Sequence, residues 1–151
     1  MKDVNKGRLM AGGALAALVM IVGELGIEPL MAPDVDGWLR SLGVTPPGEE
    51  AAVAVVLLAF VVGVITVHLY ASIAPRYGFR PATALRAGAI VWALSCAIPN
   101  VFMVVYGIMP FGKLFWFATI WPLVESLAAA WVGTRVYRED PAEPRAQFAH
   151  A

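Results

Sequence analysis

Polar side chains inside otherwise apolar stretches are the most chemically suggestive residues of this chain. Glu24, Glu125 and His68 each lie within a long apolar run. Asn100 is a neutral polar residue in a similar setting, and Glu28 follows Glu24 by four residues, a spacing that puts both on one face of a helix. Ionisable groups are costly inside a bilayer and often mark ion or proton pathways. The pattern therefore indicates an acidic site that binds a proton or a cation.

The surrounding composition places these residues in a membrane. The chain has 151 residues, of which 60% are apolar and 15% charged, whereas soluble domains carry about 25% charged residues. A spanning helix needs about 20 mainly apolar residues, and continuous runs that do not alternate argue against a barrel. We therefore predict an all-α membrane protein, an antiparallel bundle of four transmembrane helices over residues 9–31, 51–74, 82–109 and 111–137.

The predicted helices bring three of the polar residues to a similar depth. With a rise of 1.5 Å per residue, Glu24 lies about 24 Å from Arg8. Asn100 lies about 21 Å from Arg86, and Glu125 about 18 Å from Tyr137. We expect these three side chains to meet in one layer and to bind the ion. Glu28 is expected nearer the outer surface, and His68 nearer the inner one.

Two prolines lie beside this layer. Pro99 leaves the carbonyl of Ser95 without its helical donor, and Pro122 does the same for Ala118. We expect kinks with free carbonyls near the acidic groups, because broken helices build cation sites in many transporters. The alternative is structural: a protonated membrane glutamate can serve as a hydrogen-bond donor between helices.

No cofactor or metal site is predicted. His150, the other histidine, lies in the C-terminal tail, so a bis-histidine haem site is not formed, and the ligands of a structural zinc site are absent. Cys96 is the single cysteine. We expect His68 to face the bundle or the inner interface. The chain contains no HExxH, GxSxG, Walker A or GxGxxG motif, so an enzyme is not expected.

The basic residues predict the orientation. Nine of the eleven Lys and Arg residues fall on one side of the predicted topology, which places both termini in the cytoplasm. A signal peptide is a weaker interpretation of the first segment, because it lacks a good cleavage site and carries two glutamates. Three arginines of the loop after the second helix are expected to contact anionic lipid. These are Arg76, Arg80 and Arg86.

Three further regions have predicted roles. Residues 34–42 are expected to form a short interfacial helix, with Asp34 at its start, Trp38 at headgroup depth and Gly43 at its end. Residues 138–151 are expected to be disordered. An aromatic belt is expected at the outer interface. Its members are Phe111, Phe115, Trp116, Phe117 and Trp121.

Small residues predict how the helices pack. Each segment contains a small-xxx-small pair, a motif that lets membrane helices approach closely. Residues 9–18 also resemble residues 85–94 at an offset of 76, which suggests a duplicated helical hairpin; chance similarity of small-residue helices explains it equally well. The four pairs are Gly12–Ala16, Ala59–Gly63, Ala89–Ala93 and Ala129–Gly133.

Several short strings carry a resemblance to a known group. The chain resembles small uncharacterised bacterial four-helix integral membrane proteins of unknown activity, over most of its length. The resemblance implies a bacterial inner membrane and the four-helix layout. The strings are Ala11-Gly12-Gly13 through Gly23-Glu24, Leu69-Tyr70 with Pro75-Arg76, and Trp121 with Val124-Glu125 and Gly133 through Tyr137-Arg138-Glu139.

Two functions follow from these observations. The protein is either a small proton- or cation-linked transporter or channel component, or an accessory subunit of a larger membrane complex whose buried polar residues only stabilise helix packing. Balanced charge, with 11 basic and 11 acidic residues, excludes a generally basic nucleic-acid binder. A homo-oligomer or a partner within a membrane complex is expected, because four helices rarely enclose a pathway.

Overall fold

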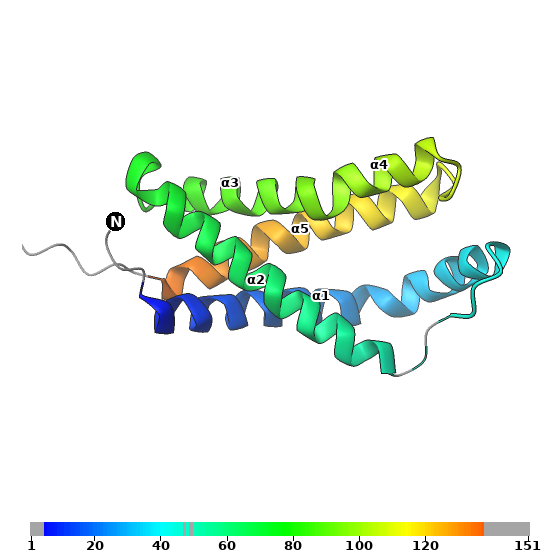
Figure 1. The fold of residues 1–151 in the computed structure, drawn as a ribbon, viewed down its shortest axis with the longest axis horizontal. Helices are drawn as coiled ribbons and strands as arrows, with labels where there is room; N and C mark the ends of the chain where they lie inside the picture. The colour runs from blue at the N-terminus through cyan, green and yellow to red at the C-terminus, as the bar shows by residue number, and fades with distance from the viewer. Residues whose placement is uncertain (1–4, 47, 49, 138–151) are drawn as a thin grey trace, which may run out of the picture.

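A computed structural model of the chain describes residues 5–46, 48 and 50–137. Among these residues, four helical units are long and apolar enough to cross a membrane, as a multi-pass membrane protein requires, and the predicted all-helical fold is confirmed. The predicted disordered tail lies outside the described residues. The elements are α1 (Lys6–Ser41), α2 (Glu50–Tyr77), α3 (Pro81–Trp92), the π-helical turn η1 (Ala93–Ala97), α4 (Ile98–Val105) and α5 (Lys113–Val136) (Figure 1).

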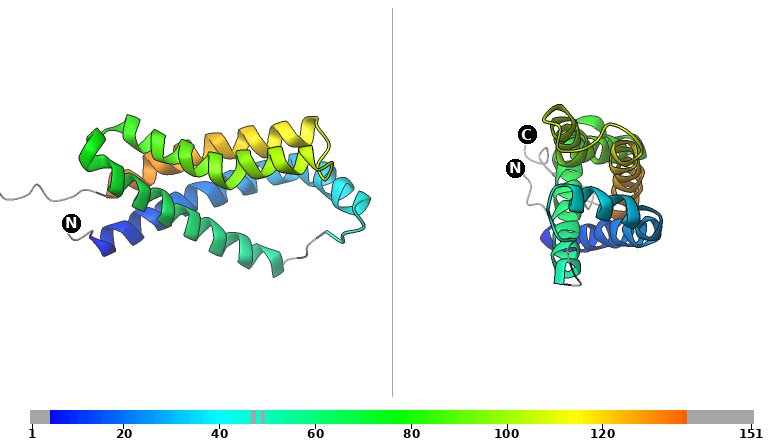
Figure 2. Two further views of the ribbon diagram at one scale, coloured as in Figure 1. Left: turned by 45° about the horizontal axis from the view of Figure 1, so that its top comes forward. Right: turned by 90° about the vertical axis from the view of Figure 1, so that its right-hand side faces the viewer.

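The four units surround a common centre. The α1–α2 connection and the α4–α5 turn lie at one end of the molecule, and the α2–α3 turn lies at the other (Figure 1). Seen end-on, the units occupy the corners of a four-sided bundle (Figure 2). Helix α1 packs against α2 and α5, while α3 packs against the same two helices from the opposite side.

Close glycine contacts join α1, α2 and α5. A Cβ atom added to Gly12 would lie 2.7 Å from the carbonyl oxygen of Gly133, and a Cβ on Gly133 would lie 2.7 Å from that of Gly12. A Cβ on Gly63 would press on the backbone of Gly13 and lie 2.9 Å from the nitrogen of Ala17. We call the part of the bundle built on these contacts the closed half.

Members of the predicted small-residue pairs make the close helix contacts in three of the four helical units. Gly12, Gly63 and Gly133 all belong to such pairs, and all are buried. Helix α3 differs, because its close contact is made by Gly88 rather than by the predicted pair Ala89–Ala93. A Cβ on Gly88 would lie 2.6 Å from the carbonyl oxygen of Ser126.

Helix α1 is longer than predicted. Its 36 residues include residues 34–41, so the expected separate interfacial helix is instead the end of α1. At 1.5 Å per residue, α1 is about 54 Å long, well beyond the roughly 30 Å of a hydrocarbon core. Tertiary contacts hold this extension in place: Trp38 Nε1 donates to the carbonyl of Ile108 at 2.7 Å, and Asp34 forms an ion pair with Lys113 at 2.6 Å instead of capping a helix.

The third unit contains an irregular turn before Pro99. Residues Ala93–Ala97 form the π-helical turn η1, and Pro99 lies in the first turn of α4. Hydrogen bonds in a π-helix join residues five apart rather than four, so the turn is wider than an α-helical turn. The wider turn accommodates the proline within one continuous span. This unit ends at Val105 rather than at the predicted residue 109. Gly107, with φ of 68°, allows the reversal that follows.

Candidate functional site

Glu125 is held in a defined position within the bundle. It lies in α5 and is only 6% exposed. Trp121, one helical turn earlier, donates its Nε1 hydrogen to Glu125 Oε1 at 2.6 Å. On the facing helix, a Cβ added to Gly23 would lie 2.8 Å from Glu125 Cδ. The missing side chain at Gly23 therefore provides the space that the carboxyl group occupies.

Glu24 of α1 meets Glu125 of α5. Their side chains are joined by a hydrogen bond between the two carboxyl groups. Ionised carboxylates are acceptors only, so such a bond requires a proton on one of the partners. We call these two residues the carboxyl pair, and their contact across the α1–α5 interface can hold one shared proton.

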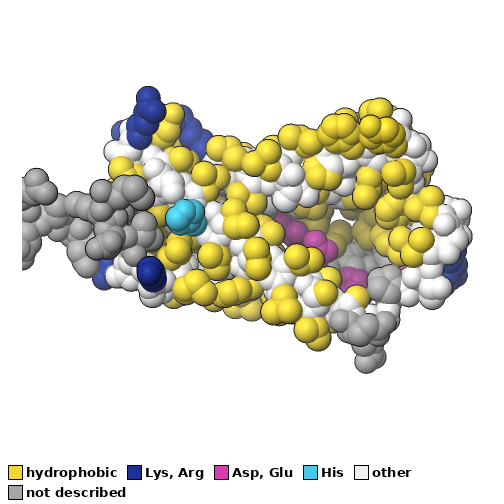
Figure 3. Space-filling view, in the orientation of Figure 1, with side chains coloured by type: hydrophobic (Ala, Val, Ile, Leu, Met, Phe, Trp, Pro, Cys, Tyr) yellow, Lys and Arg dark blue, Asp and Glu magenta, His cyan; other side chains and the backbone are white. Residues whose placement is uncertain are grey.

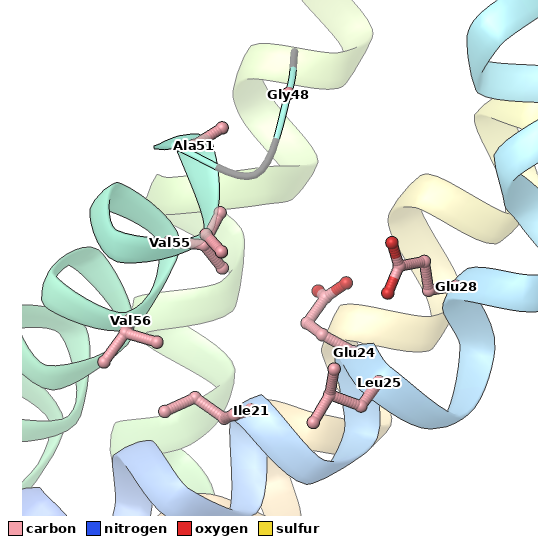
Figure 4. Close-up of a pocket in the computed structure, with 9 residues that line it drawn as sticks. Ile21, Glu24, Leu25, Glu28, Gly48, Ala51, Val55 and Val56 are labelled. Atoms are coloured by element: carbon pink, nitrogen blue, oxygen red, sulfur yellow. The ribbon is translucent and has the colours of Figure 1, made fainter. Parts of the chain in front are cut away.

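A cavity of about 680 Å³ lies beside the carboxyl pair, between α1 and the beginning of α2. Glu24 and Glu28 both project from α1 toward this cavity (Figure 4). Acidic side chains are visible within a hollow bordered by apolar ones (Figure 3). We call this part of the bundle the open half. The apolar lining consists of Ile21, Leu25, Ala51, Ala52, Val55 and Val56.

Asn100 binds α5 rather than the carboxyl pair. Its Nδ2 donates to the carbonyl of Ala118 at 2.8 Å and to Thr119 Oγ1 at 3.1 Å. Cys96 Sγ, one turn earlier, also donates to the carbonyl of Ala118, at 3.0 Å. The sequence predicted that Pro122 would leave this carbonyl free for a cation. The structure corrects that expectation, because the side chains of Asn100 and Cys96 already donate hydrogen bonds to the Ala118 carbonyl.

His68 lies away from the acidic site. Its side chain is exposed, and it lies in the last third of α2, toward the α2–α3 turn. Of the two positions expected for His68, the one facing the bundle is therefore wrong, and the one at the inner interface stays a prediction. Within the part of the chain that the structure describes, no group of three His, Cys, Asp or Glu residues could hold a metal ion.

Two residues of the predicted aromatic belt have other roles. Phe111, Trp116 and Phe117 are exposed, as a belt requires. Phe115 is instead buried against residues of α1 and the α4–α5 turn, and Trp121 binds Glu125. The four-residue spacing of Trp121 and Glu125 could have revealed this contact, since residues i and i+4 are neighbours on a helix. Cys96 and Asn100 have the same spacing.

Comparison with known proteins finds no protein-family model, curated protein or solved structure that matches this chain.

Proposed function

We propose that this protein is a small membrane transporter or channel component in which the carboxyl pair binds and releases a proton or a cation. The observation that carries the proposal is the contact of Glu24 with Glu125 at the wall of the cavity. Two carboxyl groups in contact gain or lose a proton as a unit. Glu28, four residues along α1, supplies a further acidic group to the lining of the cavity.

We also propose a membrane location and an orientation for the protein. We place the antiparallel bundle in a bacterial inner membrane. Both termini are assigned to the cytoplasm, because basic residues are concentrated at the end of the bundle that holds the termini and the α2–α3 turn. Arg86 lies 5.3 Å from the ring centroid of Tyr77, beside the α2–α3 turn. This arrangement supports contact with anionic lipid headgroups by Arg76, Arg80 and Arg86. We assign no enzymatic activity to the protein.

The proposed hairpin duplication has some support in the packing. Gly63 of α2 lies against Gly13 of α1. In the second hairpin, a Cβ on Gly88 of α3 would lie 2.9 Å from the Cβ of Ala130 in α5. Each hairpin thus has a close small-residue contact between its two helices, as a duplicated unit with parallel repeats would have.

Proton flux into proteoliposomes tests the proposal. Vesicles containing the full chain and a trapped pH-sensitive dye are given a potassium diffusion potential, and the experiment is repeated with sodium and potassium gradients. We expect flux above that of empty vesicles, and we expect Glu125→Gln to abolish it because the pair then lacks one of its carboxyl groups. Asp36→Asn is the matched control, because Asp36 pairs with Arg40 at the exposed end of α1.

The second candidate function is that of an accessory subunit, favoured by the hydrogen bonds that Asn100 and Cys96 make to α5. In that case Glu125→Gln and Glu24→Gln change no flux but weaken helix packing. Extraction from native membranes in mild detergent would then yield a large particle containing other proteins. A small homo-oligomer with Glu125-dependent flux would support the transporter.

A further inference from the structure

The cavity of the open half has two chemically different walls. On the α1 side, the carboxyl groups of Glu24 and Glu28 face the space (Figure 4). On the α2 side, the wall is apolar and includes Ala52, Val55 and Val56. None of the described residues that line the cavity is Lys, Arg or His. The lining therefore favours a ligand that carries positive charge on one side and apolar surface on the other.

Nearby basic residues do not neutralise the acidic wall. Lys113 contacts Asp34 at 2.6 Å, and Arg40 contacts Asp36 at 3.8 Å. Both ion pairs lie in or beside the extension of α1, beyond the cavity lining. A carboxylate beside apolar walls interacts more strongly with a cation than one in water, because the effective dielectric constant is lower.

The size and chemistry of the cavity favour an organic cation over a bare metal ion. Hard cations such as Ca²⁺ take six to eight oxygen ligands, whereas the described side chains that line the α2 wall are all hydrocarbon. No group of three potential metal-ligating residues occurs in the described chain. A volume of about 680 Å³ falls within the range of pockets that bind organic molecules, whose walls are mainly apolar with a few polar groups.

We propose that this cavity binds an organic cation with an apolar body. Its charged group lies against Glu24 and Glu28, and its apolar part lies against Ala52, Val55 and Val56. This inference rests on the proposed function, since it names the species that the carboxyl pair exchanges for its proton. One positive charge enters the site as the shared proton leaves to water, so the charge of the site is unchanged.

Binding of tetraphenylphosphonium to the full chain in detergent tests the inference. Tetraphenylborate is the matched probe, because it has nearly the same size and shape and the opposite charge. Protein-free micelles give the background for both ions. We expect saturable binding of the cation and none of the anion. Glu24→Gln should weaken binding of the cation by roughly tenfold or more, because one of the two carboxylates that face the charged group is lost.

A pair of variants on α2 tests the location. Ala52→Trp fills the cavity and is expected to abolish binding. Ala54→Trp adds the same side chain to an exposed position outside the lining and should leave binding unchanged. Val55→Phe and Val53→Phe form a second pair of the same design, for use if Ala52→Trp does not fold. Equal binding by the two members of a folded pair would place the site elsewhere and overturn the inference.

The remaining outcomes separate the inference from the proposed function. Equal binding of the cation and the anion, or no saturable binding of either, would mean that the cavity is an unselective apolar space filled by lipid chains, and would overturn the inference. If proton flux still depends on Glu125, the proposed function survives that result. Selective cation binding in the cavity without any Glu125-dependent flux would instead overturn transport and leave a binding site.

Discussion

The closed and open halves of the bundle are held together in different ways. In the closed half, Gly12 lies against Gly133 and Gly63 against Gly13, so helix backbones touch. In the open half, α1 and the beginning of α2 flank a cavity, and the side chains of Trp92 and Asn100 join the third unit to α5 by hydrogen bonds. Lipid offers no hydrophobic driving force between helices, so membrane bundles depend on close contact and on hydrogen bonds. In this molecule, close contact holds the closed half together, and hydrogen bonds hold the open half together.

The difference has a consequence for function. Backbone contact leaves no space for a ligand, whereas polar contacts can hold helices while a cavity remains between them. The carboxyl pair lies at the boundary, with Gly23 giving Glu125 its space and Glu24 facing the cavity. A rigid closed half would fix α1 and α5 while the open half admits a ligand.

The largest effect is expected from breaking the closed half. Gly63→Leu would force a side chain into the backbone of α1 and should destabilise the protein by about 3 kcal/mol or more. Gly26→Leu is the control, because nothing lies within 4 Å of a Cβ at that position. Thermal unfolding in detergent measures both. Equal melting temperatures would show that the glycine contact does not hold the helices together.

A smaller effect is expected at the boundary between the halves. Trp121→Phe removes the donor to Glu125 Oε1 and leaves a buried acceptor unpaired, which should cost about 2 kcal/mol. The same substitution at Trp116, which is 52% exposed, should have little effect on stability. Proton flux should also fall in Trp121→Phe, because Glu125 loses the contact that orients it. A flux equal to that of Trp116→Phe would contradict the positioning role of Trp121.

The smallest effect is expected from the polar contact between α4 and α5. Asn100→Leu removes the hydrogen bonds to Ala118 and Thr119 and should cost about 0.6 kcal/mol, the typical value for a polar contact between membrane helices. Ser95→Ala is the control, since the Ser95 hydroxyl donates to a carbonyl of its own unit. Unfolding by a denaturing detergent measures the difference. Loss of Glu125-dependent flux without loss of stability would instead give Asn100 a direct part in ion binding.

The depth estimate from helical rise brought Glu24 and Glu125 into one layer, and the structure joins their side chains. The same estimate included Asn100, whose amide instead binds the backbone of α5. Depth locates a residue along a helix, but it does not specify toward which neighbour the side chain points. That direction depends on the rotation of each helix about its axis, which tertiary packing sets.

The sequence by itself determined the membrane class, the four spans and three of the small-residue contacts, because hydropathy, span length and small side chains are local properties. Only the tertiary structure decided that α1 continues past Pro33, that the Ala118 carbonyl is occupied and that a cavity opens beside Glu24. Each of these depends on residues far apart in the chain: Trp38 with Ile108, Asn100 with Ala118, and Glu24 with the first turns of α2. Such contacts follow from how whole helices are placed against one another, which local sequence patterns do not encode.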